Sequence, residues 1–273
     1  VYDVIDDLIS KPELLETFVL EGSYHTARFK EGVVYVIGTR YVESSSPIMP
    51  YFGTKDKTEN AAISDVYYSG YYSSNLVFTS VMAVEIDSLE YSLDVFLTGY
   101  NGVIYVSDNS IYLTSPKNYD YWDIQEKTVS LTANILPGKF GDEARKIAGS
   151  EDEYYVKNEK IAQITQSYFN TLSVEDKKEF ENKLTIAYSD YYKEVSKEYE
   201  KTIIHKIDID GLDIDYSGSG EVSGLTLNQF SMDENKGYFR IATTTGQSFG
   251  SNQGTLNHLY ILDKDMKIVG KVE

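Results

Sequence analysis

The sequence predicts a mainly β protein, namely a partial β-propeller of about three and a half four-stranded blades with an α-helical hairpin insertion. One strand–turn–strand pattern occurs three times, and a second pattern alternates with it along the chain. In one long segment, the spacing of apolar residues changes from every second residue to about every 3.6 residues, as in an amphipathic helix.

The first pattern consists of a short strand, a turn rich in Gly, Asn, Asp or Lys, and then an aromatic β-run. Its copies span 24–40, 102–115 and 228–245. Alternating apolar residues around such a turn are typical of a β-hairpin. We call this hairpin ab.

The second pattern is an apolar strand that ends in Asp, a polar turn and another strand, which we call hairpin cd. Its copies span 1–22, 82–99, 203–220 and 259–273. A carboxylate at the strand end can accept backbone N–H groups of the turn, so these aspartates need no ligand to explain them. They are Asp6, Asp87, Asp208 and Asp263.

The two hairpins follow one another in the order cd, ab–cd, ab–cd, ab–cd. Tandem four-stranded antiparallel units favour a propeller, whereas a β-sandwich would not require the same order three times. We therefore assign 1–138 and 202–273 to propeller blades and 139–201 to a helical hairpin. Because a closed ring usually has at least about four blades, we expect open blade edges and self-association through them.

The helical hairpin is predicted from two apolar stripes. Ser173 followed by Asp176 resembles the start of a second helix. The first stripe has spacings of 3, 4 and 4, and the second has spacings of 4, 4, 3, 4 and 4. The stripes are Ile161, Ile164, Tyr168 and Leu172, then Phe180, Leu184, Tyr188, Tyr191, Val195 and Tyr199.

The alternation within each hairpin predicts which side chains are buried between blades. Tyr238 and Phe239 should point to opposite faces, because side chains alternate along a strand. The predicted core consists of Val34, Val36, Val84, Ile86, Ile104, Val106, Ile111, Leu113, Ile207, Phe239, Ile241, Leu259 and Ile261.

The connections between strands b and c differ greatly in length and leave one face of the predicted propeller, where loops usually carry binding. Residues 42–74 are rich in Ser, Pro and Tyr and show no periodicity. Their tyrosines predict either a ligand-contact surface or a long loop held against its own blade. The candidate ligand-binding residues are Tyr67, Tyr68, Tyr71 and Tyr72.

Charge and composition exclude several classes of function. The chain has 25 Lys and Arg against 43 Asp and Glu, a net charge of −18, which opposes binding to nucleic acid or anionic membranes. The absence of cysteine excludes disulfides, thiolate metal sites and a cysteine nucleophile. No segment has the roughly 18 consecutive apolar residues of a membrane span. No nucleotide-phosphate motif is present, and we expect no cofactor.

Three patterns suggest catalysis or metal binding only weakly. Ser248 lies in a Gly-x-Ser-x-Gly string, but a strand and not a helix is predicted after it, so we expect no nucleophile. The carboxylates around Gly211 resemble a calcium loop, but the glycine stands at the wrong position, so a solvated hairpin is the favoured explanation and calcium a weak alternative. They are Asp208, Asp210, Asp213 and Asp215. The scattered His25, His205 and His258 show no metal-ligand spacing.

Several segments resemble a known family. They are LNQFSMDE at 227–234, GYFRIATT at 237–244, YHTARFKEGVVYVI at 24–37, the segment 102–114, and EKTIIHKIDIDG at 200–211. This family comprises archaeal and bacterial secreted proteins whose β-propeller domain is distantly related to WD repeats. The resemblance implies secretion or cell-surface display and the same helical insertion, but it supplies no catalytic residues and no ligand.

These observations favour an extracellular or cell-surface binding or scaffolding module for an unknown protein or glycan. Two alternatives stay open. One is a secreted hydrolase with a carboxylate or Ser248 on the insertion face, which should bring carboxylates or a Ser–His pair together. The other is a structural component of the cell envelope.

Overall fold

The computed structural model describes residues 13–43, 48–68, 70, 75–100, 102–246 and 254–273, together with the backbone of Tyr2–Asp3. These residues form two compact units. The β-unit comprises 1–118, 201–245 and 256–273, and the helical unit comprises 119–200 and 246–255.

Three sheets of the β-unit follow the predicted order a-b-c-d, and each step between neighbouring strands is antiparallel. Sheet I is β4 (Ser23–Lys30), β5 (Val33–Tyr41), β9 (Leu76–Glu85) and β10 (Tyr91–Gly99). Sheet II is β11 (Val103–Val106), β12 (Ser110–Pro116), β13 (Lys201–Asp210) and β14 (Asp213–Ser223). Sheet III is β15 (Met232–Asn235), β16 (Tyr238–Thr245), β17 (Leu256–Leu262) and β18 (Ile268–Val272).

The repeated turns have a common backbone chemistry. The ab hairpins of sheets I and III each turn through two residues with positive φ, Glu31-Gly32 and Lys236-Gly237. This conformation matches the right-handed twist of the strands, and glycine adopts it without a steric cost. The same two-residue turn therefore fixes the same register in both sheets.

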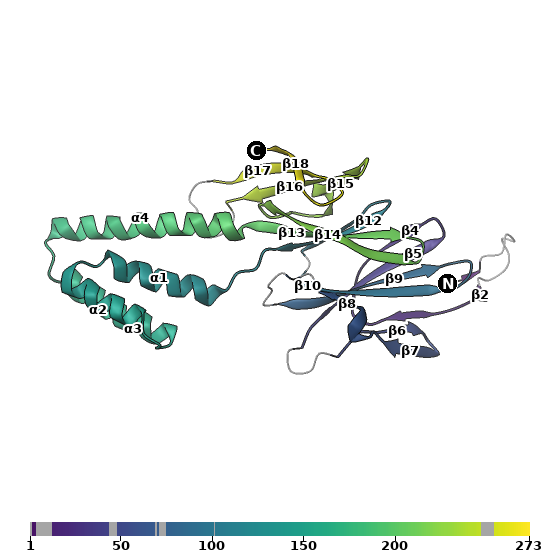
Figure 1. Cartoon of the computed structure of the whole chain (residues 1–273), viewed down its shortest axis with the longest axis horizontal. Helices are drawn as coiled ribbons and strands as arrows, with labels where there is room; N and C mark the ends of the chain where they lie inside the picture. Colours follow the sequence, from purple (N-terminus) through teal and green to yellow (C-terminus); the bar gives the residue numbers. More distant parts are fainter. Residues whose placement is uncertain are drawn as a thin grey trace. The chain divides into compact units, whose positions relative to one another are not determined.

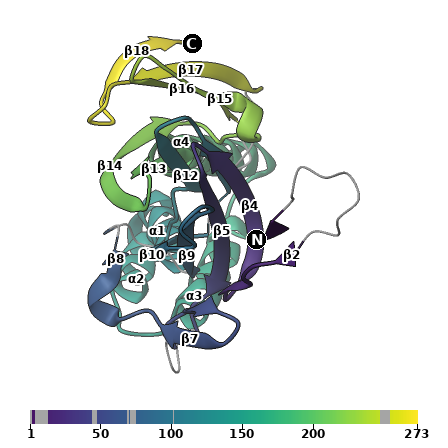
Figure 2. The ribbon, with the colours of Figure 1, turned by 90° about the vertical axis from the view of Figure 1, so that its right-hand side faces the viewer.

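The sheets pack face to face through two hydrophobic cores (Figure 2). The first core joins sheets I and II and includes Tyr35, Ile111 and Ile207. In the second, which joins sheets II and III, the rings of Tyr112 and Phe239 stack with centroids 4.0 Å apart. Sheet II is thus covered on both faces, and six consecutive residues of β12 are buried.

Hydrogen bonds between the sheets fix how the packed sheets are placed relative to one another. The Tyr35 hydroxyl donates to the Gly211 carbonyl at 2.8 Å, across the interface of sheets I and II. Across the next interface, the Tyr112 hydroxyl and the Ser107 hydroxyl donate to one oxygen of Glu234, at 3.0 and 2.5 Å. Burial and the Glu234 carboxylate hold the pKa of Tyr112 well above its usual value, so the phenol stays a donor.

The N-terminal region and the first long connection differ from the expectation. Within the expected 1–22 hairpin, β1 (Tyr2–Asp3) pairs with β2 (Glu13–Leu14), and 4–12 lie outside the described residues. Moreover, residues 42–74 are not simply a loop. They contribute β6 (Tyr51–Thr54), β7 (Lys57–Asn60) and β8 (Val66–Tyr68), because their Tyr, Phe, Thr and Val residues favour strands.

These added strands extend the β-unit in two places. Strands β6 and β7 form a three-stranded sheet with β3 (Phe18–Leu20), and Phe18 and Phe52 pack edge-on against Tyr91 of sheet I. Strand β8 pairs in parallel with β10 and makes sheet I five-stranded. No sheet formed by the described residues is closed, and the number of blades stays a prediction.

The predicted helical hairpin is wrong in number and in starting point, because the described part of the helical unit contains four helices (Figure 1). They are α1 (Tyr121–Ile135), α2 (Gly138–Ala148), α3 (Tyr154–Phe169) and α4 (Val174–Tyr199). The first helix contains Thr, Val and aromatic residues, which are weaker helix formers, and the second contains two glycines, so local propensity hides both. Ser173 does cap α4, since its hydroxyl accepts from the Asp176 N–H at 3.1 Å.

The core prediction is correct for most residues and wrong for five. Val84, Ile104, Val106, Ile111, Leu113, Ile207, Phe239 and Ile241 are buried, and Tyr238 is 49% exposed on the face opposite Phe239. In contrast, Val34, Val36, Ile86 and Ile261 are only half-buried, and Leu259 is exposed. Both faces of these strands carry large apolar side chains, so alternation alone does not identify the inner face, where Tyr35 and Tyr260 lie.

We predict that Phe239→Ala destabilises the chain by about 3–5 kcal/mol, because it leaves a cavity against Tyr112. The neighbouring variant Tyr238→Ala is the control and should cost less than about 1 kcal/mol, since its ring is half exposed. Denaturant unfolding measures both values. Similar losses for the two variants would contradict the assigned faces.

The outer face of sheet III predicts self-association. Ala242, Leu259 and Val272 lie side by side on it, and no further sheet among the described residues covers them. Exposed apolar faces of this kind favour contact between molecules. Light scattering should show a mass that rises with concentration for the wild-type chain and a constant monomer mass for Leu259→Lys. A monomer mass at every concentration for the wild-type chain would refute this expectation.

Candidate functional site

The tyrosines expected to contact a ligand are only partly within the described residues. Tyr67 and Tyr68 lie on β8, whereas Tyr71 and Tyr72 lie outside the described part of the chain. The Tyr67 ring stacks on Tyr216 of sheet II with centroids 3.8 Å apart and tilts against Phe96. Tyr67 therefore helps to attach β8 to the stack of sheets, while Tyr68 is 54% exposed.

A second tyrosine pair, which the sequence analysis missed, lies at the end of the sheets where the long connections leave. Tyr41 ends β5 and Tyr100 directly follows β10. Their rings are nearly parallel, at 3° with centroids 5.8 Å apart, and they are 61% and 54% exposed. Each stands one residue beyond a predicted strand, and this common position is the signal that could have revealed the pair.

Backbone hydrogen bonds fix the base of this pair. The Tyr100 N–H donates to the Asn75 carbonyl, and the Val42 N–H donates to the Leu76 carbonyl, both at 3.0 Å. The strand ends that carry the two tyrosines are thus held together by the sheet itself. Rigid aromatic rings with polar tips are well suited to contacting a ligand that is part apolar and part polar.

The tyrosine pair borders a hollow of about 290 Å³. Asn75 and Asn118 contribute amide groups, and Pro116 contributes an apolar edge. The volume is at the lower end of the range for small-molecule sites. We call these five residues, Tyr41, Asn75, Tyr100, Pro116 and Asn118, the tyrosine hollow.

The aspartates considered as calcium ligands lie around the opposite end of sheet II. Lys206 Nζ is 2.8 Å from Asp208 Oδ1, and the Ser110 hydroxyl donates to the same oxygen at 2.8 Å. Burial alone would raise the pKa of Asp208, but hydrogen bonds from Lys206, Ser217 and Ser110 and the lysine charge lower it overall. The lysine therefore already supplies the positive charge that Asp208 needs.

The other aspartates border a hollow of about 500 Å³ at this end of sheet II. Its lining includes Asp210, Asp213 and Asp215 together with Lys30 and Lys206. Within the described ranges, no three His, Asp or Glu side chains come close enough to hold a metal ion.

The three histidines lie on three different sheets and are not brought together. His25 lies on β4, the buried His205 on β13 and the buried His258 on β17, each in a different sheet. His205 Nδ1 is 3.1 Å from the Tyr216 hydroxyl, and His258 Nε2 is 2.8 Å from the Thr245 hydroxyl. Ser248 lies outside the described residues.

Asp94 is a carboxyl group with a raised pKa. It lies in the middle of β10, between Ser92, which bonds to sheet II, and Phe96, which belongs to the first core. Burial, reinforced by the negative charges of Asp215 and Asp65, raises its pKa to about 6. Its place in mid-strand, away from the end that bears the tyrosine hollow, indicates a cost to stability and not a catalytic position.

We predict a pH dependence of stability from Asp94. Its pKa in the folded state lies above the usual 3.8, so the folded state holds this proton more tightly than the unfolded state. The resulting stability is fully present below about pH 4 and is lost as pH rises through about 6. At pH 8, the free energy of unfolding of Asp94→Asn should therefore exceed that of wild type by about 1 kcal/mol, after allowance for solvent screening. The variant should accordingly unfold at a higher denaturant concentration.

At pH 4 the free energy of unfolding of Asp94→Asn should equal that of wild type. The control Asp87→Asn, at an exposed turn residue, should equal wild type at both pH values. Denaturant unfolding from pH 4 to 8 measures the difference. An Asp94→Asn effect that does not change with pH would rule out the buried carboxyl as its cause.

None of the described helices combines the length and the apolar character needed to cross a bilayer.

Comparison with known proteins identifies the family. A model of the β-propeller domain matches residues 1–273, the whole chain. An uncharacterised protein of Methanocaldococcus jannaschii is 28% identical over 267 residues, which are 96% of this chain and 41% of that protein. Another, of Archaeoglobus fulgidus, is 27% identical over 256 residues, which are 92% and 40%. The chain thus spans about two fifths of the length of these relatives, and it belongs to the β-propeller domain family.

Proposed function

We propose that this chain is a ligand-binding module that acts outside the cell or at its surface and holds a glycan at the tyrosine hollow. The observation that carries the proposal is the exposed, nearly parallel pair Tyr41 and Tyr100, set at the end of sheet I on hydrogen-bonded strand ends. Membership in the β-propeller domain family supports a binding or scaffolding role in general. The location outside the cell rests on the resemblance to secreted proteins.

A glycan fits the chemistry of the hollow better than a strongly charged ligand does. Sugar rings have apolar C–H faces that pack on aromatic rings, and hydroxyl groups that bond to amides and phenols. The hollow offers both kinds of group, from Tyr41, Tyr100, Asn75 and Asn118, and none of its five residues is charged. A net charge of −18 further disfavours anionic ligands.

The hydrolase alternative has less support. His205 bonds to the Tyr216 hydroxyl and His258 to the Thr245 hydroxyl, and neither of these contacts is the Ser–His pair that activates a nucleophile. Asp94 lies away from the end that bears the hollow.

We predict that Tyr41→Ala and Tyr100→Ala each weaken glycan binding by about tenfold, because each removes one stacking surface worth about 1–1.5 kcal/mol. The full chain, labelled with a fluorophore, is applied to a glycan array, and the strongest glycan is titrated by calorimetry. Tyr41→Phe should keep most of the affinity, since it keeps the ring.

The matched control is Tyr24→Ala, which removes another exposed tyrosine, from β4, and should bind as wild type does. Binding that survives the loss of both Tyr41 and Tyr100, or no binding to any glycan, would refute the proposal.

A further inference from the structure

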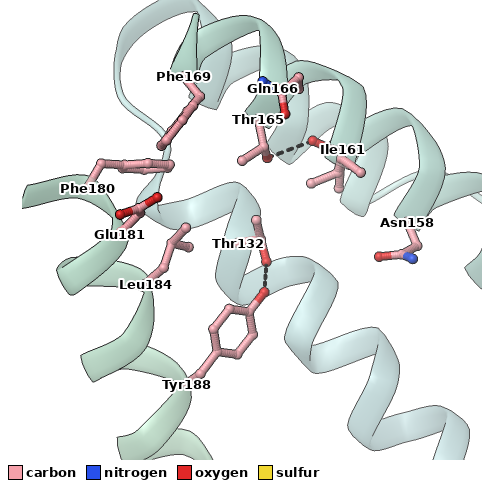
Figure 3. Close-up of a pocket in the computed structure, with 11 residues that line it drawn as sticks. Thr132, Asn158, Ile161, Thr165, Gln166, Phe169, Phe180, Glu181, Leu184 and Tyr188 are labelled. Carbon is pink, nitrogen blue, oxygen red and sulfur yellow. Dashed lines mark hydrogen bonds between the residues drawn. The ribbon is translucent and has the colours of Figure 1, made fainter. Parts of the chain in front are cut away.

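The helical unit contains an open groove that the proposed glycan site does not involve (Figure 3). Its walls are α3 and α4, each of which packs against α1 more extensively than against the other. A hydrogen bond between Thr132 of α1 and the Tyr188 hydroxyl of α4 joins two of these helices at the groove. The hollow has a volume of about 460 Å³.

Each wall presents side chains at a spacing of four residues. On α3 they are Ile161, Thr165 and Phe169, and on α4 they are Phe180, Leu184 and Tyr188. Residues four apart lie one above another on a helix, so each wall is a continuous stripe along its helix axis. The hydroxyl of Thr165 donates to the Ile161 carbonyl at 2.7 Å, which satisfies it within its own helix.

One carboxylate lines this groove, to which polar and apolar side chains contribute about equally. Figure 3 shows Glu181 beside the Phe180 ring at the groove, and among the described residues no lysine or arginine forms an ion pair with it. Other glutamates of α4 are paired along the helix, Glu179 with Lys183 and Glu194 with Lys197, both at 2.7 Å. Glu181 is thus a negative charge available to a basic side chain of a ligand.

The shape of the groove favours a helix as its occupant. Helices pack at axis distances of about 8–10 Å through side-chain stripes of this spacing. A helix laid between α3 and α4 would complete a four-helix arrangement with α1, whose apolar core is already continuous from Ile161 to Phe180. Recognition of an amphipathic helix in a groove depends on apolar anchors at i, i+4 and i+7 of the guest.

We propose that this groove binds an amphipathic helix of a partner protein, whose apolar stripe packs on Phe169, Phe180 and Leu184 and whose Lys or Arg pairs with Glu181. This interaction is independent of the glycan site. It gives the chain two separate binding surfaces, one on each unit, as a scaffolding module requires.

The test uses a fluorescein-labelled helical peptide of about 18 residues, the length of a five-turn helix. One version carries leucine at i, i+4, i+7 and i+11 with flanking lysines, and the other has the same leucines with glutamates in place of the lysines. Fluorescence anisotropy measures binding of each to the full chain. We expect saturable binding of the lysine peptide and binding of the glutamate peptide that is at least about tenfold weaker.

The variant Glu181→Lys should reverse this preference between the two peptides. Its control is Glu179→Lys, on the same helix but outside the groove lining, which should bind as the wild-type chain does. Leu184→Ala, whose side chain is half-buried, should weaken binding of both peptides without loss of helical circular dichroism.

Three results would overturn the proposal. The first is no saturable binding of either peptide, and the second is an equal effect of Glu181→Lys and Glu179→Lys. The third is self-association that Leu184→Ala abolishes, which would make a second copy of the chain the occupant. Because Tyr41→Ala and Tyr100→Ala leave the helical unit unchanged, they should not affect peptide binding, so failure of one site is distinguishable from failure of the other.

Discussion

Face-to-face packing of β-sheets is the constraint on which the rest of the β-unit depends. Sheet II buries both of its faces, so β12 and β13 are buried along most of their length, including their Ser, Thr and His residues. The aromatic rings between sheets also carry polar tips that bond across the interface, as Tyr35 does to Gly211 and Tyr112 to Glu234. The packing thus gives both the cohesion and the relative position of the sheets.

The two ends of the stacked sheets differ in their chemistry as a consequence. At one end, strands b, c and d of sheet I bring Tyr41, Asn75 and Tyr100 together with no charged group in the hollow. At the other end, the turns bring Asp210, Asp213 and Glu234 together with Lys30 and Lys206. The first end is suited to an uncharged ligand. The charges at the second are partly balanced within the chain, as the contact of Lys206 with Asp208 shows.

The sequence was informative where local chemistry decides the structure and misleading where tertiary contacts do. Turns such as Glu31-Gly32 and the alternation around them predicted the hairpins and the order of strands in three sheets. Alternation failed for Val34 and Leu259, because both faces of their strands are apolar and only the neighbouring sheet selects one. Helix α1 was missed, and α2 was not recognised as a separate helix within 139–201, because packing, and not propensity, stabilises them.

The candidate sites, too, depend more on tertiary contacts than on local sequence. The tyrosines of β8 drew attention as a cluster in sequence, yet Tyr67 stacks within the fold on Tyr216. Tyr41 and Tyr100 are far apart in the sequence and meet only because β5 and β10 end where β9 begins, at the same edge of sheet I. Likewise, the stripes of α3 and α4 were predicted as core, but the open groove between them depends on how each helix packs on α1.

The central claim, that sheets II and III pack face to face through aromatic rings, is tested most directly by nuclear Overhauser effects in the full chain with labelled Tyr and Phe. We predict strong cross-peaks between the rings of Tyr112 and Phe239, whose centroids are 4.0 Å apart. Absence of these cross-peaks, while those between neighbouring strands of sheet III are present, would contradict the account.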